Sequence, residues 1–306
     1  MRLRESRAHH LWFVNKRRMH AMVVRDFGEK GRGVVASRTI VDGEMLFQCM
    51  PMASVLKEEG QCDSLCVQCF SPIVGGGVSG RTQYCSNACA SHHEARGGLM
   101  LSRADLAPLH QLHAEQGRKF PLHIAQLLAG LLHELKATGR VPEAWPPLEL
   151  CYAELEDEAE VDSQVASEHL ALLDAFDAAG LASRSTLELF LPEARYRRLL
   201  GAAQLNAFEL RLSHGAVVSA LLPGIASCFN HSCEPTVLIS CGESTGVSFV
   251  ANTVGVGAGA SGGTIAEGHE LCISYIDLDA PAPERQHTLL HKYGFRCDCA
   301  RCRRGE

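Results

Sequence analysis

The sequence contains no apolar run of about 18 residues, the length that a membrane-spanning helix requires. Its N-terminus has no apolar signal-peptide core. The formal net charge is −6, so the chain also lacks the excess of positive charge that is typical of proteins dominated by phosphate-backbone binding. With 306 residues, of which 46% are hydrophobic and 21% charged, it can bury a substantial core. We therefore expect a globular protein that neither binds nucleic acid directly nor enters a membrane.

Cysteine, by contrast, is abundant, with fourteen residues in the chain. Seven of them fall into closely spaced groups, and an eighth, Cys233, lies in a polar motif described below. Cys-x2-Cys and Cys-x-Cys spacings without a secretory signal favour metal sites over disulfides, which predicts a reducing intracellular compartment, nuclear or cytoplasmic. We interpret the other six as small buried apolar residues: Cys49, Cys62, Cys151, Cys228, Cys241 and Cys272.

Residues 1–19 form a basic lead-in. Within it, six arginine and lysine side chains stand against a single acid, Glu5. We interpret this stretch as a solvated approach to the first strand. The same composition fits a mitochondrial or plastid targeting segment, which remains the alternative.

Apolar periodicity divides the rest of the chain into five parts of a mixed α+β fold. They are residues 20–61, 62–99, 100–203, 204–284 and 285–306. The first and fourth parts alternate short apolar runs with turn signals, such as Asp42-Gly43, and predict strands. The second is rich in cysteine and glycine, the third carries leucines at helical spacing, and the last is a cysteine-rich tail.

Three helices are expected in the block 100–203. Leucines from Leu122 to Leu135 predict the first, with Gly139 as its stop. A second is expected over about 163–180, and Pro192 opens a third. The acidic run within 154–162 is interpreted as a solvated surface, with a docking site for a basic peptide as the alternative.

A glycine-rich stretch near the end formally matches a dinucleotide-binding fingerprint, Gly257-x-Gly259-x2-Gly262. That fingerprint requires a preceding strand and a following helix. Here the chain continues through Thr264-Ile265 into another strand. We therefore expect a hairpin loop at 255–263.

Two cysteine pairs define an inserted zinc module. Cys66-x2-Cys69 is followed by Cys85-x3-Cys89, and four thiolates on two tight turns can close a tetrahedral zinc site. The segment from Tyr84 to Cys89 resembles part of a MYND finger. The sequence therefore predicts a MYND-like module.

A complete MYND finger interleaves two zinc sites, and this chain lacks part of the second. A second Cys-x2-Cys pair is missing, and Gly97 stands four residues beyond His93, where a cysteine is usual. We therefore expect one zinc ion in the module. Cys62, His92 and His93 are spare ligand candidates, and for the histidines a helix-end or surface role is preferred.

Four short segments carry the remaining chemistry. The central one, Asn230 to Pro235, places polar side chains, a thiol and a proline where neither a helix nor a strand interior is favoured. The others are Lys30 to Gly33, Glu270 to Asp277 and Tyr293 to Cys302. In this order, with the finger after the first, they resemble the signature of SET-domain lysine methyltransferases of the SET-and-MYND (SMYD-type) family. Because no long helical domain follows Cys302, the chain is similar to the shorter members.

This resemblance implies a fold of small twisted β-sheets around a pseudoknot, with the Asn230 segment beneath the one that ends at Tyr275. It implies transfer of a methyl group from S-adenosylmethionine to a lysine of a histone or non-histone protein, with Tyr275 at the methyl-transfer centre. The implied cofactor-binding residues are Lys30, Arg32, Asn230, His231, Tyr293 and Phe295. The implied substrate channel is lined by Asn206, Phe208, Tyr275 and Tyr293.

A second zinc site is expected in the tail. Cys297, Cys299 and Cys302 leave a tetrahedron one ligand short, so the fourth must come from elsewhere in the chain. The resemblance assigns that place to Cys233, which makes about two zinc ions in all. One departure from the family pattern is Thr236, which follows Pro235 where asparagine is usual.

Two other classes of function compete with this interpretation. In one, the protein is a non-catalytic interaction scaffold whose zinc module recruits peptide partners and whose SET core is vestigial. In the other it is a zinc hydrolase, but both cysteine sets predict closed sites and the sequence contains no His-Glu-x-x-His.

Overall fold

The computed structural model describes residues 3–4, 21–57, 65–73, 83–140, 145, 147, 150–153, 159–241, 246–256 and 263–306. The chain forms two compact units. Unit 1 comprises Met1–Met50, Leu222–Gly242 and Gly246–Glu306, and unit 2 comprises Pro51–Leu221 and Glu243–Thr245. The basic lead-in lies almost entirely outside the described residues, as does Cys62. No helix within the described ranges has the length and apolar character to cross a bilayer.

Unit 1 is built from three small sheets. The strands of the largest are β2 (Met22–Asp26), β3 (Arg32–Ala36), β10 (Asn230–His231) and β14 (Glu270–Ile273), in the order β10-β14-β3-β2. The second has the order β11-β12-β5, from Val237–Cys241, Val247–Ala251 and Met45–Cys49. The third pairs β13 (Thr264–Ile265) with β4 (Ile40–Val41). All pairs are antiparallel except β10 with β14, which is parallel.

Aromatic stacking fixes the centre of unit 1. Phe47 and Phe249 are register partners on β5 and β12, with ring centroids 4.3 Å apart. Phe229 stacks on Phe249 at 5.3 Å, and all three rings are buried. Because Phe229 immediately precedes β10, this stack holds the start of the polar Asn230 segment against the core.

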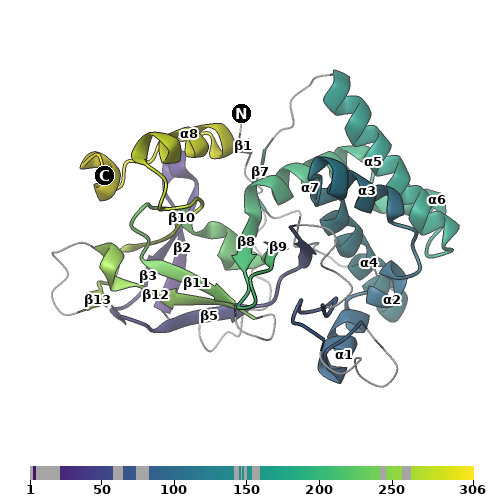
Figure 1. The fold of residues 1–306 in the computed structure, drawn as a ribbon, viewed down its shortest axis with the longest axis horizontal. Helices are drawn as coiled ribbons and strands as arrows, with labels where there is room; N and C mark the ends of the chain where they lie inside the picture. The colour runs from purple at the N-terminus through teal and green to yellow at the C-terminus, as the bar shows by residue number, and fades with distance from the viewer. Residues whose placement is uncertain are drawn as a thin grey trace. The chain divides into compact units, whose positions relative to one another are not determined.

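Short helices complete unit 1. They are the 3-10 turns η2 (Gly28–Lys30), η5 (Gly224–Cys228) and η6 (Thr253–Val256), with α8 (Ala282–Tyr293) and α9 (Ala300–Arg303) in the tail. The two-residue strand β1 (Leu3–Arg4) precedes them. Figure 1 shows α8 and the C-terminal turn together in yellow, next to the β10 and β2 ends of unit 1.

Unit 2 combines one sheet with a helical block. Strands β6 (Ala53–Leu56), β9 (Val217–Leu221) and β8 (Ala207–Arg211) form an antiparallel sheet with β9 in the centre. The helices are α1 (Asn87–Ala95), α2 (Gly98–Leu101), α3 (Ala107–Gln116), α4 (Phe120–Thr138), α5 (Ala159–Ala178), α6 (Arg184–Phe190) and α7 (Glu193–Asn206), with the short strand β7 (Tyr152–Ala153).

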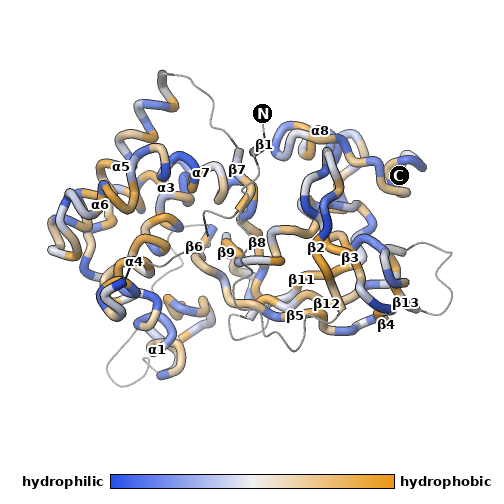
Figure 2. The backbone as a smooth tube through the Cα atoms, turned by 180° about the vertical axis from the view of Figure 1, so that it is seen from behind, coloured by the Kyte–Doolittle hydropathy of each residue, from blue (hydrophilic) through white to orange (hydrophobic). Residues whose placement is uncertain are grey.

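The three predicted helices are confirmed. Helix α4 ends at Gly139, which caps it in a left-handed conformation at φ 69°, and its tube is largely orange in Figure 2 because its leucines form the core. Helix α5 covers the second prediction, and Pro192 is the N-cap of α7. Of the acidic run, Asp162 forms an ion pair with Arg197 at 2.7 Å, while 154–158 lie outside the described residues.

Strand pairing leaves the predicted turn at Asp42-Gly43 in place but shows that the hairpin predicted at 255–263 is wrong. Gly43 turns the chain at φ 71°, but the strands on either side pair elsewhere, β4 with β13 and β5 with β12. The strands flanking the glycine-rich stretch, β12 and β13, also pair with different strands. Since β13 follows that stretch, a helix does not, and the dinucleotide-binding interpretation is excluded; residues 257–262 themselves lie outside the described residues.

Candidate functional site

Strand pairing brings two of the predicted segments together. Asn230 is the register partner of Cys272, and His231 is that of Ile273. The Ser232 N–H then donates to the Ile273 carbonyl at 2.9 Å. The Asn230 segment therefore lies directly beside the strand that leads to Tyr275, as the resemblance implies.

Tyr275 is anchored at its hydroxyl and at its backbone. The hydroxyl donates to the Phe229 carbonyl at 2.5 Å, and the N–H donates to His231 Nδ1 at 3.1 Å. The Tyr293 hydroxyl donates to the Tyr275 carbonyl at 3.3 Å. The phenol proton is therefore directed toward the Phe229 carbonyl, and the ring is held on two sides.

An aromatic cluster surrounds Tyr275. Its ring centroid lies 4.9 Å from that of Tyr293, and 6.4 Å from that of Phe295 in an edge-on arrangement. The His231 ring lies 5.4 Å from Tyr275 and 6.1 Å from Phe295. Tyr293 is supplied by the end of α8, whose αL cap at Gly294 redirects the chain toward Phe295. The structure thus gathers four of the predicted site residues into one group.

The hydrogen bonds of His231 determine its protonation. Nδ1 accepts from Tyr275, so the ring proton is on Nε2, which lies 3.4 Å from the Cys233 sulfur. Burial, reinforced by the positive charge of Arg285, lowers the pKa of His231 to about 4. His231 is therefore a neutral imidazole that connects Cys233 to the backbone of Tyr275.

Two features position the Asn230 side chain: the Glu270 carboxylate and the absence of a side chain on Gly33. Its amide nitrogen donates to Glu270 Oε1 at 2.7 Å. A Cβ atom on Gly33 would lie 2.8 Å from that nitrogen and 2.6 Å from the Phe27 ring, so only glycine fits here. The second glycine of the Gly-x-Gly pair therefore makes room for Asn230. Glu270 is a positioning residue that sequence reasoning did not single out.

Two other predicted cofactor-binding residues, Arg32 and Lys30, lie shortly before Gly33 in the chain. Arg32 opens β3 opposite Asp26, just before Gly33. Lys30 lies in the preceding turn and pairs with Asp298 of the tail at 3.6 Å across exposed side chains. The Lys30 turn, the Asn230 segment and the tail are therefore neighbours in unit 1.

The tail cysteines and Cys233 form one cluster. The sulfur atoms of Cys233, Cys297, Cys299 and Cys302 all lie within 4.8 Å of one another. Four sulfurs without an open position are the donor set of a structural zinc site. The predicted second ligand set therefore fits a zinc ion.

Two side chains that the sequence analysis did not identify hold the tail in place. The Gln286 amide on α8 accepts from the Cys297 N–H at 3.0 Å and donates to its carbonyl at 2.7 Å. Glu234 accepts from the Arg301 N–H at 3.0 Å and from the Arg304 guanidinium at 2.6 Å. Glu234 follows the predicted ligand Cys233, and Gln286 lies eleven residues before Cys297, so neither has a signal that could be recognised from sequence.

Thr236 replaces the usual asparagine without leaving a polar group unpaired. Its hydroxyl accepts from the Cys272 N–H at 2.9 Å and donates to the Glu270 carbonyl at 3.5 Å. The residue is buried. It therefore ties the turn after Pro235 to β14, and the turn geometry is satisfied.

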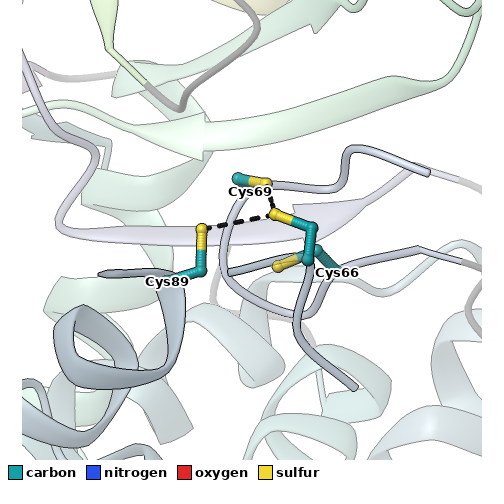
Figure 3. Close-up of side chains that lie close together, drawn as sticks. Cys66, Cys69 and Cys89 are labelled. Atoms are coloured by element: carbon teal, nitrogen blue, oxygen red, sulfur yellow. Dashed lines mark hydrogen bonds between the residues drawn. The ribbon is translucent and has the colours of Figure 1, made fainter. Parts of the chain in front are cut away.

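The finger cysteines form the second cluster, within unit 2. The sulfur atoms of Cys66, Cys69, Cys85 and Cys89 lie within 4.8 Å of one another. Figure 3 shows Cys89, on α1, pointing toward Cys66 and Cys69 on the preceding loop. Ser86 caps α1 by accepting from the Cys89 N–H at 3.1 Å, which fixes the start of the helix. This donor set also fits a zinc ion.

The spare histidines are outside both clusters that the described residues form. His93 Nδ1 is bonded to the Tyr84 hydroxyl at 2.9 Å, and His92 is exposed on α1. Gly97 adopts φ 83°, and a Cβ there would lie 2.4 Å from the Ala129 carbonyl of α4. A cysteine at position 97 would therefore collide with α4.

Asn206 and Phe208 belong to unit 2. The Asn206 amide donates to the carbonyls of Cys151 and Ala202, both at 2.7 Å, at the end of α7. Phe208 lies on β8 opposite Ala220. Their role in a substrate channel stays a prediction.

Comparisons with known proteins were made for the whole chain. No protein-family model matches it. It is 28% identical over 287 residues to N-lysine methyltransferase SMYD2-B of Danio rerio and 30% identical over 294 residues to SMYD2 of Mus musculus, covering 89% of this chain and 58% of each relative. It is 25% identical over 299 residues to Histone-lysine N-methyltransferase ATXR4 of Arabidopsis thaliana, covering 89% of this chain and 83% of that protein.

Among solved structures, the SET domain of LSMT bound to lysine and AdoHcy is similar at a TM-score of 0.43 with 12% identity, covering 90% of this chain and 53% of that chain. The chain thus spans just over half the length of the SMYD2 relatives. The resemblance to SET-and-MYND lysine methyltransferases is confirmed by these relatives.

Proposed function

We propose that this protein transfers a methyl group from S-adenosylmethionine to the lysine side chain of a protein substrate. The observation that carries the proposal is the arrangement around Tyr275, whose hydroxyl and backbone are both fixed inside an aromatic group. The names of the sequence relatives support the same activity. Histone and non-histone substrates fit it equally.

The residues that would hold the cofactor are Lys30, Arg32, Asn230, His231, Tyr293 and Phe295. When bound, S-adenosylmethionine supplies an activated methyl group on a sulfonium. The bond from the Asn230 amide nitrogen to Glu270 fixes the orientation of this side chain, whose Oδ1 would accept from the cofactor's ammonium group. Residues from three segments of unit 1 would then share one ligand.

The aromatic residues prepare the incoming lysine. A lysine ammonium with a pKa of about 10.4 cannot act as a nucleophile until it loses a proton. Tyr275, Tyr293 and Phe295 provide apolar walls that disfavour the charged form. The Tyr275 hydroxyl, held in place by its bond to the Phe229 carbonyl, would orient the neutral amine toward the methyl group.

The first test is calorimetric titration of the zinc-replete protein with S-adenosylmethionine. We expect saturable binding that Asn230→Ala abolishes. Asn87→Ala, at an exposed position at the start of α1, is the matched control and should bind like the wild type. If the folded wild-type protein does not bind, the non-catalytic scaffold becomes the better interpretation.

We also propose that an apolar peptide partner docks on unit 2 beside the finger. A cavity of about 570 Å³ is lined by finger residues such as Leu65 and Phe70 and by α3 residues such as Ala107 and His113. His113 Nε2 donates to the Leu56 carbonyl at 2.8 Å, which fixes this side of the cavity against β6. In a peptide-library screen, Ala107→Arg should remove the binding and Ala114→Arg, also exposed on α3, should not.

The compartment stays a prediction. An intracellular location, nuclear or cytoplasmic, is supported by the free thiol state of every cysteine in the described ranges. The absence of direct nucleic-acid binding also stays a prediction, resting on the net charge of −6.

A further inference from the structure

A small polar cavity adjoins the larger apolar cavity of unit 2. Its volume is about 40 Å³, and the residues that line it include Gln68 and Arg96. The two cavities share part of their walls, among them His93, Leu101 and Gln126. A ligand that lies in the larger cavity can therefore extend one group into the smaller one.

Arg96, the C-cap residue of α1, brings a positive charge to these cavities. Among the described residues that line either cavity, it is the only lysine, arginine, aspartate or glutamate. Its Nη2 donates to the Met52 carbonyl, a neutral acceptor on the wall of the same small cavity. None of the ion pairs within the described ranges involves Arg96. In this part of the chain the guanidinium is thus partly buried without a carboxylate partner.

The hydrogen bonds around Arg96 show which polar groups are available to a ligand. Gln126 is already used, because its Oε1 accepts from the Ser54 N–H at 2.9 Å and its Nε2 donates to the Ser54 carbonyl at 2.7 Å. Gln68 is only 8% exposed, and no hydrogen bond within the described ranges uses its side chain. The Arg96 guanidinium binds Met52 through one nitrogen and has further N–H donors. The small cavity therefore offers hydrogen-bond donors together with a positive charge.

We propose that the peptide bound beside the finger is apolar and inserts one acidic side chain, an aspartate or a glutamate, into the small cavity against Arg96. This rests on the proposed docking of an apolar peptide on unit 2 and specifies the chemistry of that partner. A carboxylate accepts paired hydrogen bonds from a guanidinium, and partial shielding from water strengthens the attraction between the two charges.

The size of the small cavity favours a side chain over a chain end. Its volume exceeds the roughly 10 to 15 Å³ that a single water needs, which gives room for the heavy atoms of a carboxylate. A carboxylate on a side chain reaches this volume while the peptide backbone stays in the larger cavity. A C-terminal carboxylate would bring its own backbone with it.

A screen of random peptides on the full-length, zinc-replete protein tests the proposal. The wild type should select apolar peptides that carry an aspartate or a glutamate at a fixed distance from their apolar residues. Replacing that acid by its amide in a selected peptide should weaken binding to the wild type by a factor on the order of 10 to 100, because the charge is lost but not the size. The same replacement should change binding to Arg96→Met by less than about twofold, since the partner of the acid is already gone.

Arg103→Met is the matched control. Arg103 is exposed, donates to one backbone carbonyl, that of Ala179, at 2.9 Å, and is not among the described residues that line either cavity. This variant should bind the selected peptide like the wild type and keep the preference for the acid over the amide. The comparison of acid with amide on the wild type does not depend on the folding of Arg96→Met.

The outcomes separate this inference from the docking on which it rests. Selection of apolar peptides without an acid, or equal affinity of the wild type for acid and amide, would overturn the role of Arg96 and leave the docking standing. Peptides that lose binding on amidation of their C-terminus, and not on replacement of an internal acid, would also overturn the side-chain assignment. If the folded wild type selects no peptide, both proposals fail.

Discussion

The Tyr275 N–H donates to His231 Nδ1 at 3.1 Å, and the same imidazole directs its Nε2–H toward the Cys233 sulfur, 3.4 Å away. One neutral side chain therefore joins a predicted zinc ligand to the backbone of the predicted catalytic residue. The imidazole acts as a spacer with a donor on one side and an acceptor on the other. Few other side chains can make both bonds in this geometry.

Replacing His231 with leucine tests this connection. We expect methyl transfer to fall by about tenfold or more and tail zinc to be released faster, because two partly buried hydrogen bonds of about 1 kcal/mol each are lost. Turnover and zinc release are measured on the same preparation. His287→Leu, at an exposed position on α8, is the control. A variant with normal turnover and normal zinc retention would show that the connection has no function.

Removing the Tyr275 hydroxyl distinguishes its role in catalysis from its contribution to stability. Tyr275→Phe should reduce methyl transfer about 100-fold or more, because the oxygen that orients the amine is gone. Thermal unfolding should change by only a few degrees, since one hydrogen bond, to Phe229, is lost. Tyr84→Phe also loses one buried hydroxyl hydrogen bond, to His93, and should retain turnover. Near-normal turnover of Tyr275→Phe would remove Tyr275 from its proposed role.

The metal content provides a third test. Native mass spectrometry should find about two zinc ions per chain, one for each four-cysteine cluster. Cys233→Ser and Cys85→Ser should each retain one. Only Cys233→Ser should also weaken S-adenosylmethionine binding, because its cluster holds the tail beside the aromatic group. An unchanged zinc count in Cys233→Ser would contradict the tail site as drawn.

The stability of unit 2 should depend on the ionisation of His123. This side chain is fully buried, with its two nitrogens 3.1 and 2.9 Å from the carbonyls of Lys119 and Ser219, and burial lowers its pKa from 6.5 to about 4. Below pH 6.5 His123 binds a proton in the unfolded chain, whereas in the folded chain it stays neutral down to about pH 4. The free energy of unfolding should therefore fall by up to about 3 kcal/mol over this interval, and stay unaffected by His123 above it.

Chemical denaturation at several pH values measures how the free energy of unfolding changes with pH. His123→Gln should be less stable at neutral pH, because one of the carbonyls loses its partner, but its unfolding free energy should fall less steeply between pH 6.5 and 4. His287→Gln serves as the exposed control. An identical slope in wild type and His123→Gln would assign the pH dependence to other groups.

Several features of the protein were determined by local sequence. The finger pairs and the three tail cysteines were recognised from their spacing, and Cys233 was assigned by the family resemblance. The structure brings the four sulfurs of each set together. Helix α4 was predicted because its leucines recur at helical spacing and Gly139 can adopt the left-handed cap. The assignment of Tyr275, His231, Tyr293 and Phe295 to one site came from their ordered motifs, and the structure gathers them.

Only the tertiary structure decided which partners these residues have. The pairing of β4 with β13, the position of Glu270 beside Asn230 and the bond from Tyr275 to His231 all join residues far apart in the sequence. The conflict between Gly97 and Ala129 is of the same kind. Periodicity and spacing report only on neighbours along the chain. A buried charge or a close backbone approach is defined by what packs against it, and that is known only when the chain is folded.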